Sequence, residues 1–424
     1  MPVLTTPPRP VRTTGPRVAR LVARLAVTDD PGRAALTAEF WSEVQRLGTP
    51  LVEAAPDAPD ERVVTFLWRG HRATRQVLLC GGPLVDGEQL AGALLEHVPG
   101  TDVWQLGLRL RADHRGSYRL AADISTKEPP TDPEELQLRL RSLSVHAAAD
   151  PLNPRTIPRR WQRADSSVFA LPGAPALPPG IPDRTAPDAG RAVRHPVPSV
   201  PLGGARDTWV YLPVGGALAG APPLPVVVLT DGDMWFGRLG LAHTLDALIA
   251  AGALPPLAVL APDAVDRPTR RRELADRDAF VTFLATELLP WAARRWPLTP
   301  DPARTVVAGQ RLGASTALYA ALRHPARFGT VLAQSATPSP EPRTTAVPPL
   351  PVRVQLDVGL QEGPSLPHTR ALYASLRTAG NHVTRSEFNG GHDYACWRVA
   401  LVQGLVRLLG ESGAQGAAGV TPRP

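Results

Sequence analysis

The residues best suited to chemistry lie in a few short stretches of the second half of the chain. In the stretch Thr305 to Ser315, a β-branched run ends at Gly309, Arg311 stands at the centre, and Gly313 opens an alanine-rich segment. A strand, a tight turn between two glycines and a helix form a nucleophile elbow, which raises the central side chain towards a substrate. The backbone N–H of Leu312 would then point into an oxyanion hole. The stretch predicts the frame of an acyl-transfer site, with an ordinary strand-to-helix crossover as the alternative.

Two later stretches supply a base and an acid in the order that such a site requires. Residues 389–398 contain Gly-Gly-His-Asp followed by Cys-Trp-Arg, and the two glycines allow a tight loop that presents His392. A lone histidine is usually structural, but the chain order elbow, acid, histidine indicates a triad base. Glu362 is the better candidate for the acid because it falls in a loop after the predicted strand 352–357, whereas Asp357 lies within that strand. Asp357 remains the alternative.

The centre of the elbow lacks a nucleophile. A guanidinium has a pKa above ~12, so Arg311 stays protonated and cannot attack an ester. Ser315 lies one helical turn beyond the centre, ~5–6 Å away, which is large against the ~3 Å alignment that acyl transfer needs. Ser335, expected at the end of the next strand, is a weaker substitute still. The sequence therefore predicts an impaired site.

A further loop could complete the oxyanion hole. The apolar run 224–229 is followed by Thr-Asp-Gly-Asp-Met-Trp at positions 230–235. Loops at the carboxyl ends of parallel strands build the sites of such sheets. We expect backbone N–H groups of Gly232 and Asp233 to face the oxyanion together with that of Leu312. The alternative is a simple turn at Asp231 and Gly232.

The elements that must position these residues form two domains. Short β-rich runs separated by Gly and Asp turns between residues 62 and 120 predict a small all-β sandwich. Apolar runs that alternate with helical patterns after residue 207 predict a doubly wound, mostly parallel sheet. Proline-rich composition marks a linker between them. The expected organisation is a flexible arm at 1–30, the β domain at 31–154, the linker at 155–192, an α/β domain at 193–410 and a disordered tail at 411–424.

Composition excludes several functions. The net charge of +7 comes from arginines spread along the chain, with Lys127 as the only lysine, and so does not indicate a nucleic-acid-binding face. Cys80 and Cys396 lie far apart in the sequence, so neither a disulfide framework nor a cysteine-ligated zinc site is expected, and we predict no metal and no cofactor. No apolar run approaches the ~20 residues of a membrane span, and no signal-type apolar core opens the chain. These features favour the cytoplasm.

Several short motifs follow one another in the first half of the chain. They are Phe-Trp at 40–41, Gly-Thr-Pro-Leu-Val-Glu at 48–53, residues 64–70, residues 100–104 and Asp-Pro-Leu-Asn-Pro at 150–154. Together they resemble the N-terminal domain of the enterochelin (ferric enterobactin) esterase family. Each motif alone is more typical of core packing, and their order makes the resemblance specific. The resemblance implies an immunoglobulin-like sandwich ahead of an α/β-hydrolase domain.

The second half extends the resemblance to nearly the whole chain. It implies hydrolysis of the ester or lactone bonds of a ferric catecholate siderophore, for iron release inside the cell, by a serine that this chain replaces with Arg311. It also implies that an Arg-x-x-Glu-Leu motif shapes the pocket, although a run of three arginines is more often a solvated face. A catalytically impaired, siderophore-binding or regulatory pseudo-esterase is the alternative function. The substrate-binding residues implied by the resemblance are Trp235, Arg270, Glu273, Trp397 and Arg398.

Overall fold

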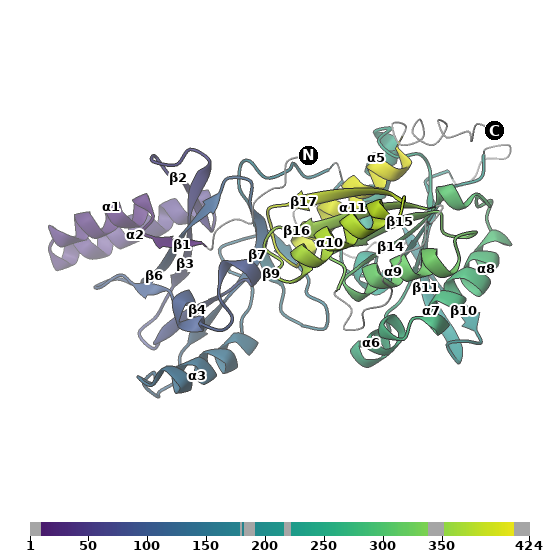
Figure 1. The fold of residues 1–424 in the computed structure, drawn as a ribbon. Coiled ribbons are helices and arrows are strands. Elements are labelled where there is room, and N and C mark those ends of the chain that lie inside the picture. Colours follow the sequence, from purple (N-terminus) through teal and green to yellow (C-terminus); the bar gives the residue numbers. More distant parts are fainter. Residues whose placement is uncertain (1–9, 179, 182–190, 216–221, 338–351, 411–424) are drawn as a thin grey trace. The chain divides into compact units, whose positions relative to one another are not determined.

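The computed structural model describes residues 10–178, 180–181, 191–215, 222–337 and 352–410 of the 424-residue chain. The chain divides into two compact units: unit 1 comprises Met1–Pro175 and Asn389–Cys396, and unit 2 comprises Ala176–Phe388 and Trp397–Pro424. Figure 1 shows the helices and strands of each unit. Among the described residues, no helix is both long and apolar enough to cross a membrane.

Unit 1 is built on two antiparallel sheets, which confirms the predicted β sandwich. Its strands are β1 (Val11–Thr13), β2 (Leu51–Ala54), β3 (Glu61–Arg69), β4 (Gln76–Cys80), β5 (Glu96–His97), β6 (Val103–Arg111), β7 (Arg115–Asp123), β8 (Thr156–Ile157) and β9 (Ser166–Ala170). One sheet has the order β1-β6-β3-β2, with β5 beside β6, and the other has the order β4-β7-β9-β8. Residues of both sheets form one core, in which the rings of Phe66, Tyr118 and Phe169 pack edge to face.

Unit 1 contains more helix than the sequence predicts. Apolar positions at helical spacing in residues 36–44 predict one short helix, and the structure has the 18-residue α2 (Asp30–Leu47) there. Part of the expected N-terminal arm is also ordered, because α1 (Pro16–Ala26) buries Val18, Leu21 and Leu25 against Phe40 and Trp41. Pro16 does not break this helix, since it stands in its first turn, where no backbone donor is needed. Residues 1–9 lie outside the described ranges. The remaining helical segments are η1 (Gly82–Leu84), η2 (Leu90–Ala93) and α3 (Pro133–Val145).

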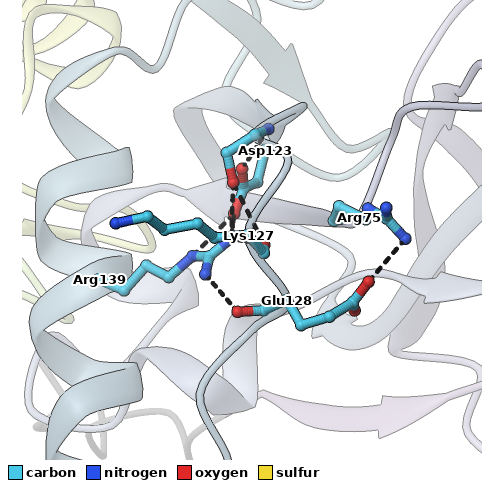
Figure 2. Close-up of polar contacts among 6 residues, drawn as sticks. Arg75, Asp123, Lys127, Glu128 and Arg139 are labelled. Atoms are coloured by element: carbon cyan, nitrogen blue, oxygen red, sulfur yellow. Dashed lines mark hydrogen bonds and ion pairs between the residues drawn. The ribbon is translucent and has the colours of Figure 1, made fainter.

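The connection from β7 to α3 is held by one arginine of the helix (Figure 2). The Arg139 guanidinium donates to Asp123 Oδ2 from Nε at 2.9 Å and from Nη2 at 2.5 Å, and to the carbonyls of Lys127 and Glu128 at 2.8 and 2.7 Å. The Glu128 carboxylate pairs with Arg75 at 3.0 Å. Because the side chains of Arg139 and Asp123 are 19% and 8% exposed, this pair stabilises unit 1 more than a surface ion pair would.

The stretch expected to be a linker begins with ordered sheet. Strands β8 and β9 lie between residues 155 and 170, and β9 pairs with β7 in the register Ser117↔Val168. Val168 and Phe169 are buried in the β domain, so residues 155–175 belong to unit 1. The sequence analysis missed these strands because the apolar run 168–171 is short and lies between the prolines at 158 and 172. Residues 182–190 of the expected linker and 411–424 of the expected tail are outside the described ranges.

Unit 2 is a mostly parallel sheet with helices, as predicted. Its strand order is β10-β11-β13-β12-β14-β15-β16-β17, with antiparallel pairing only among β10, β11 and β13. The strands are β10 (Ala192–Ser199), β11 (Gly204–Tyr211), β12 (Val226–Leu229), β13 (Ala258–Pro262), β14 (Thr305–Gln310), β15 (Thr330–Gln334), β16 (Arg353–Gly359) and β17 (His382–Phe388). Strands β12 to β15 are buried on both faces, because helices cover both sides of such a sheet.

The helices of unit 2 include the expected ones and several others. The pattern of residues 280–295 predicts one helix, and the structure has a continuous segment there of α7 (Asp278–Thr282), a π-type stretch η3 (Phe283–Leu288) and α8 (Leu289–Ala293). The sequence did not predict β10, β17 or α10, whose apolar positions are mixed with polar ones. The other helices are α4 (Gly232–Trp235), α5 (Leu241–Ala250), α6 (Arg267–Ala275), η4 (Pro302–Arg304), α9 (Leu312–Arg323), α10 (Ser365–Thr378) and α11 (Tyr394–Leu409).

Candidate active site

The elbow turn joins β14 to α9 at the carboxyl edge of the sheet. Arg311 stands between the two elements with φ 58° and ψ −119°, a conformation that a non-glycine residue rarely adopts. Its backbone N–H donates to the carbonyl of Gln334 on the neighbouring strand at 3.0 Å, and its side chain is exposed. The geometry is that of a sharp strand-to-helix turn that presents one side chain at the helix N-terminus.

Close backbone approach explains the two glycines around this turn. A Cβ at position 309 would lie 2.5 Å from the backbone carbon of Gly313 and 2.7 Å from Thr230 Oγ1. A Cβ at position 313 would lie 2.3 Å from the same oxygen. All three distances are shorter than a normal contact between heavy atoms. Glycine at positions 309 and 313 therefore allows the strand, the turn and the helix to pack this closely.

The loop after β12 is held by an ion pair. Asp231 adopts a left-handed conformation with φ 71°, and its two carboxylate oxygens accept from Nε and Nη2 of Arg270 at 2.6 and 2.7 Å. Both side chains are mostly buried, at 2% and 13% exposed. Gly232 is also required, since a Cβ there would lie 2.1 Å from the carbonyl oxygen of Ala261. Asp233 accepts from the backbone N–H of Ala264 at 3.2 Å. These contacts fix the backbone of Gly232 and Asp233, whose N–H groups are predicted to face the oxyanion.

The Glu362 carboxylate accepts hydrogen bonds from Ser335 and Gly359. Its Oε1 atom accepts from the Ser335 hydroxyl and from the Gly359 N–H, both at 2.7 Å. Trp397 Nε1 donates to the Ser335 hydroxyl at 2.8 Å. Ser335 is fully buried, with φ 52°, and its hydroxyl is engaged on both sides. Ser335 therefore supports the carboxylate, and it is poorly placed to act as a nucleophile.

The alternative acid, Asp357, lies inside β16 and is 1% exposed. Gln355 Nε2 donates to its Oδ1 atom at 2.6 Å. Burial raises the pKa of Asp357 to about 6. Its position within the strand fits a core residue better than a loop residue that orients a histidine, so Glu362 remains the preferred acid.

Side-chain amides that the sequence analysis overlooked connect the strand ends. Gln310 accepts from Trp235 Nε1 at 3.2 Å and donates to Gln334 Oε1 at 2.8 Å, and Gln334 donates to the carbonyl of Trp397 at 3.3 Å. Gln310 and Gln334 are register partners on β14 and β15, and both are buried. Both glutamines follow an apolar run as the last residue of a buried strand, and this sequence pattern could have predicted their role.

The other predicted binding residues fall into two groups. Trp235 and Arg398 come together, lining one narrow pocket with Leu239, Thr244 and Val402 among others. Glu273 instead faces Arg206, which donates to its two carboxylate oxygens at 2.8 and 2.6 Å in a nearly buried ion pair. The charges of Arg270 and Glu273 are thus largely balanced within unit 2, by Asp231 and Arg206.

Ser315 and His392 are the remaining predicted site residues. The Ser315 hydroxyl is within hydrogen-bond distance of the carbonyl oxygens of Arg311 at 3.4 Å and Thr337 at 3.2 Å. His392 is half-buried in the segment Asn389–Cys396, which is grouped with unit 1, whereas Arg311 and Glu362 are grouped with unit 2.

A two-sheet β domain followed by a mostly parallel sheet with a sharp strand-to-helix elbow defines the class of the protein, an α/β-hydrolase fold preceded by a β domain. Residues 63–179 match the family model described as "Enterochelin esterase, N-terminal", and residues 199–408 match the model described as "Putative esterase". The chain belongs to the enterochelin esterase family.

Relatives and solved structures agree with this assignment. The chain is 34% identical over 403 residues to the iron(III) salmochelin esterase of Escherichia coli O6:H1 strain CFT073, covering 89% of this chain and 95% of that protein. It is 34% identical over 409 residues to the iron(III) enterobactin esterase of Dickeya dadantii strain 3937, covering 87% and 92%. The structure resembles that of the enterobactin esterase from Shigella flexneri in the presence of enterobactin, with a TM-score of 0.73, 30% identity and coverage of 87% and 97%. It also resembles the ferric enterobactin esterase of Salmonella typhimurium, with a TM-score of 0.74, 30% identity and coverage of 88% and 98%.

Proposed function

We propose that this protein recognises ferric catecholate siderophores of the enterobactin and salmochelin kind, and that Arg311 has replaced the nucleophilic serine so that ester cleavage is impaired. The observation that carries the proposal is the exposed Arg311 side chain at the centre of the elbow, with φ 58° and ψ −119°. An elbow gives this position to the attacking group, and a guanidinium cannot attack. The role is that of a siderophore-binding or regulatory pseudo-esterase, acting inside the cell.

The chemistry of the ligand supports binding at this place. A ferric tris-catecholate is strongly anionic, and its iron is cargo carried by the ligand. Arg311 precedes the first residue of α9, where the helix dipole adds partial positive charge. Trp235, Trp397 and Arg398 are the proposed further contacts. Arg270 and Glu273, whose charges are paired within unit 2, would shape the pocket and leave the charge of the ligand to Arg311.

The remaining machinery of an esterase is proposed as follows. Glu362 orients His392, and His392 acts as the base. The N–H groups of Leu312, Gly232 and Asp233 stabilise an oxyanion. With Arg311 at the centre, the base has no hydroxyl to deprotonate.

Retained hydrolysis is the second candidate function. It is favoured by 34% identity, over 89% of the chain, to a protein named as a siderophore esterase. In that case a water activated by His392 would attack the ester. Covalent labelling by a serine-directed phosphonate would point instead to an unforeseen serine nucleophile, with Ser315 and Ser335 as the residues to examine.

Restoring the serine tests the proposal. We expect Arg311→Ser to hydrolyse a catechoyl-serine ester on the order of 10³-fold faster than the parent, because triad residues act as a unit. The matched control is Arg311→Ser combined with His392→Ala, in which the gain should vanish. The proposal of impaired cleavage is wrong if the parent already hydrolyses the ester as fast as Arg311→Ser does.

A further inference from the structure

The segment that carries His392 folds with the β domain. Asn389–Cys396 lies between β17 and α11 in the chain, yet it is grouped with unit 1. Its partners there come from the start of β7 and the turn just before it. The contacts described below all lie within unit 1.

Backbone contacts attach the segment to the first residue of β7. The Arg115 N–H donates to the carbonyl of Asn389 at 3.1 Å, and Arg115 forms an isolated parallel bridge with Gly390. At the other end of the segment, the Cys396 thiol lies 3.4 Å from the Arg115 carbonyl oxygen. One strand residue therefore contacts the segment both before and after His392.

The residue that follows His392 is fixed through both carboxylate oxygens. Asp393 Oδ2 accepts from the Ser117 backbone N–H at 3.1 Å and from the Ser117 hydroxyl at 2.7 Å. Asp393 Oδ1 accepts from the Cys396 N–H at 3.1 Å in the first turn of α11. Asp393 thus caps the helix with one oxygen and binds β7 with the other.

A second polar cluster holds the residue three positions before His392. Asn389 Nδ2 donates to Asp113 Oδ1 at 2.6 Å, and His114 Nδ1 lies 3.4 Å from Asn389 Oδ1. His114 is fully buried and stacks on Phe169, with ring centroids 5.4 Å apart. Burial lowers the pKa of His114 to about 4, so the ring is neutral at pH 7 and its Nδ1–H tautomer can donate to Asn389.

We propose that β7 and the turn before it position His392, with Ser117 and Asp113 as positioning residues that act through Asp393 and Asn389. Gly390 and Gly391 leave the segment with more backbone freedom than any other pair of residues would, and ordering each residue costs about 1–2 kcal/mol. The anchors on either side of the glycine pair offset that cost. This inference rests on the proposed role of His392 as the base.

The experiment compares Ser117→Ala, which removes the hydroxyl bond, with Ser117→Thr, which retains it. Ser142→Ala, at an exposed serine of α3 in the same unit, is the matched control. Hydrogen exchange of the full chain is followed in peptides that cover 389–396. We expect exchange there to rise about 10-fold in Ser117→Ala and to stay at the parent value in the other two variants, because a hydrogen bond to a carboxylate is lost only in the first.

A second measurement uses the same substitutions in the Arg311→Ser chain. There we expect kcat for the catechoyl-serine ester to fall about 10-fold with Ser117→Ala, KM to stay constant, and Ser117→Thr to restore kcat. Unchanged exchange at 389–396, or an increase spread evenly over unit 1, would overturn the inference. If Arg311→Ser is inactive with Ser117 intact, the proposed esterase roles of Glu362 and His392 fail while siderophore binding stands, and the exchange result alone decides whether β7 holds the segment.

Discussion

At the scale of single residues, the site contrasts one exposed cation with several buried carboxylates. Arg311 reaches solvent from a turn that is strained for a side chain, while Asp231, Asp357 and Glu362 lie within unit 2. Asp231 is balanced by Arg270, and Glu362 accepts two hydrogen bonds through one oxygen. Asp357 is 1% exposed within its strand, and burial raises its pKa to about 6.

Asp357→Asn should therefore stabilise the protein at alkaline pH. Burial raises the pKa of Asp357 to about 6 from 3.8, so the stability that its neutral form contributes is present below pH 4 and is lost as the pH rises through 6. Asparagine does not titrate. The advantage of the variant in unfolding free energy should grow by on the order of 1 kcal/mol from pH 5 to pH 8, measured by urea unfolding at both values.

Asp276→Asn, at an exposed aspartate of the same unit, provides the control and should show no such growth. An advantage that is equal at both pH values would contradict the assignment of Asp357 as a buried core acid. If Asp357→Asn abolishes the ester hydrolysis that Arg311→Ser restores, Asp357 is instead the triad acid.

At the scale of elements, the elbow depends on how closely β14, α9 and the end of β12 approach one another. The contacts that exclude a side chain at position 313 all come from Thr230, whereas those at position 309 include the backbone of Gly313. A side chain can move more easily than a backbone can. The two glycines should therefore differ in how far a substitution can be rescued.

Gly313→Ala should destabilise unit 2 by about 1–3 kcal/mol, because its Cβ would lie 2.3 Å from Thr230 Oγ1. Combining it with Thr230→Ala should recover much of this loss, whereas the same partner should rescue Gly309→Ala far less. Thermal unfolding of the single and double variants measures the coupling. Gly204→Ala, whose Cβ would meet open space, is the control. Equal rescue at 309 and 313 would refute this account of the turn.

At the scale of the whole molecule, the positive net charge of the chain favours an anionic ligand. The chain carries a formal charge of +7, and an anionic ferric siderophore would be attracted to it over several ångströms at low salt. Nine tryptophans provide a fluorescence signal for binding, and Trp235 and Trp397 lie among the proposed contacts.

Ferric enterobactin should quench tryptophan fluorescence at micromolar concentration, with an affinity that falls roughly tenfold between low and high salt. Arg311→Gln should weaken binding and flatten the salt dependence. Arg327→Gln, at another exposed arginine of unit 2, should do neither. No quenching by the parent would count against recognition of this ligand class, and equal effects of the two substitutions would show that only the net charge matters.

The sequence by itself determined the order of the domains, the central strands and the elbow. These features depend on short-range patterns: a strand buried on both faces is a continuous apolar run, and Gly-x-x-x-Gly around Arg311 marks a tight strand-to-helix turn. Edge strands such as β10 and β17 were missed because their half-exposed residues blur the pattern.

Only the tertiary structure decided which side chains the site residues meet. Arg270 pairs with Asp231, 39 positions away in the chain, and Glu273 pairs with Arg206, 67 positions away. Asp393 is bound by Ser117, 276 positions away, so the segment carrying His392 folds with the β domain. Local patterns hold no information on partners at such separations, because these contacts depend on how the sheets and their connecting loops pack.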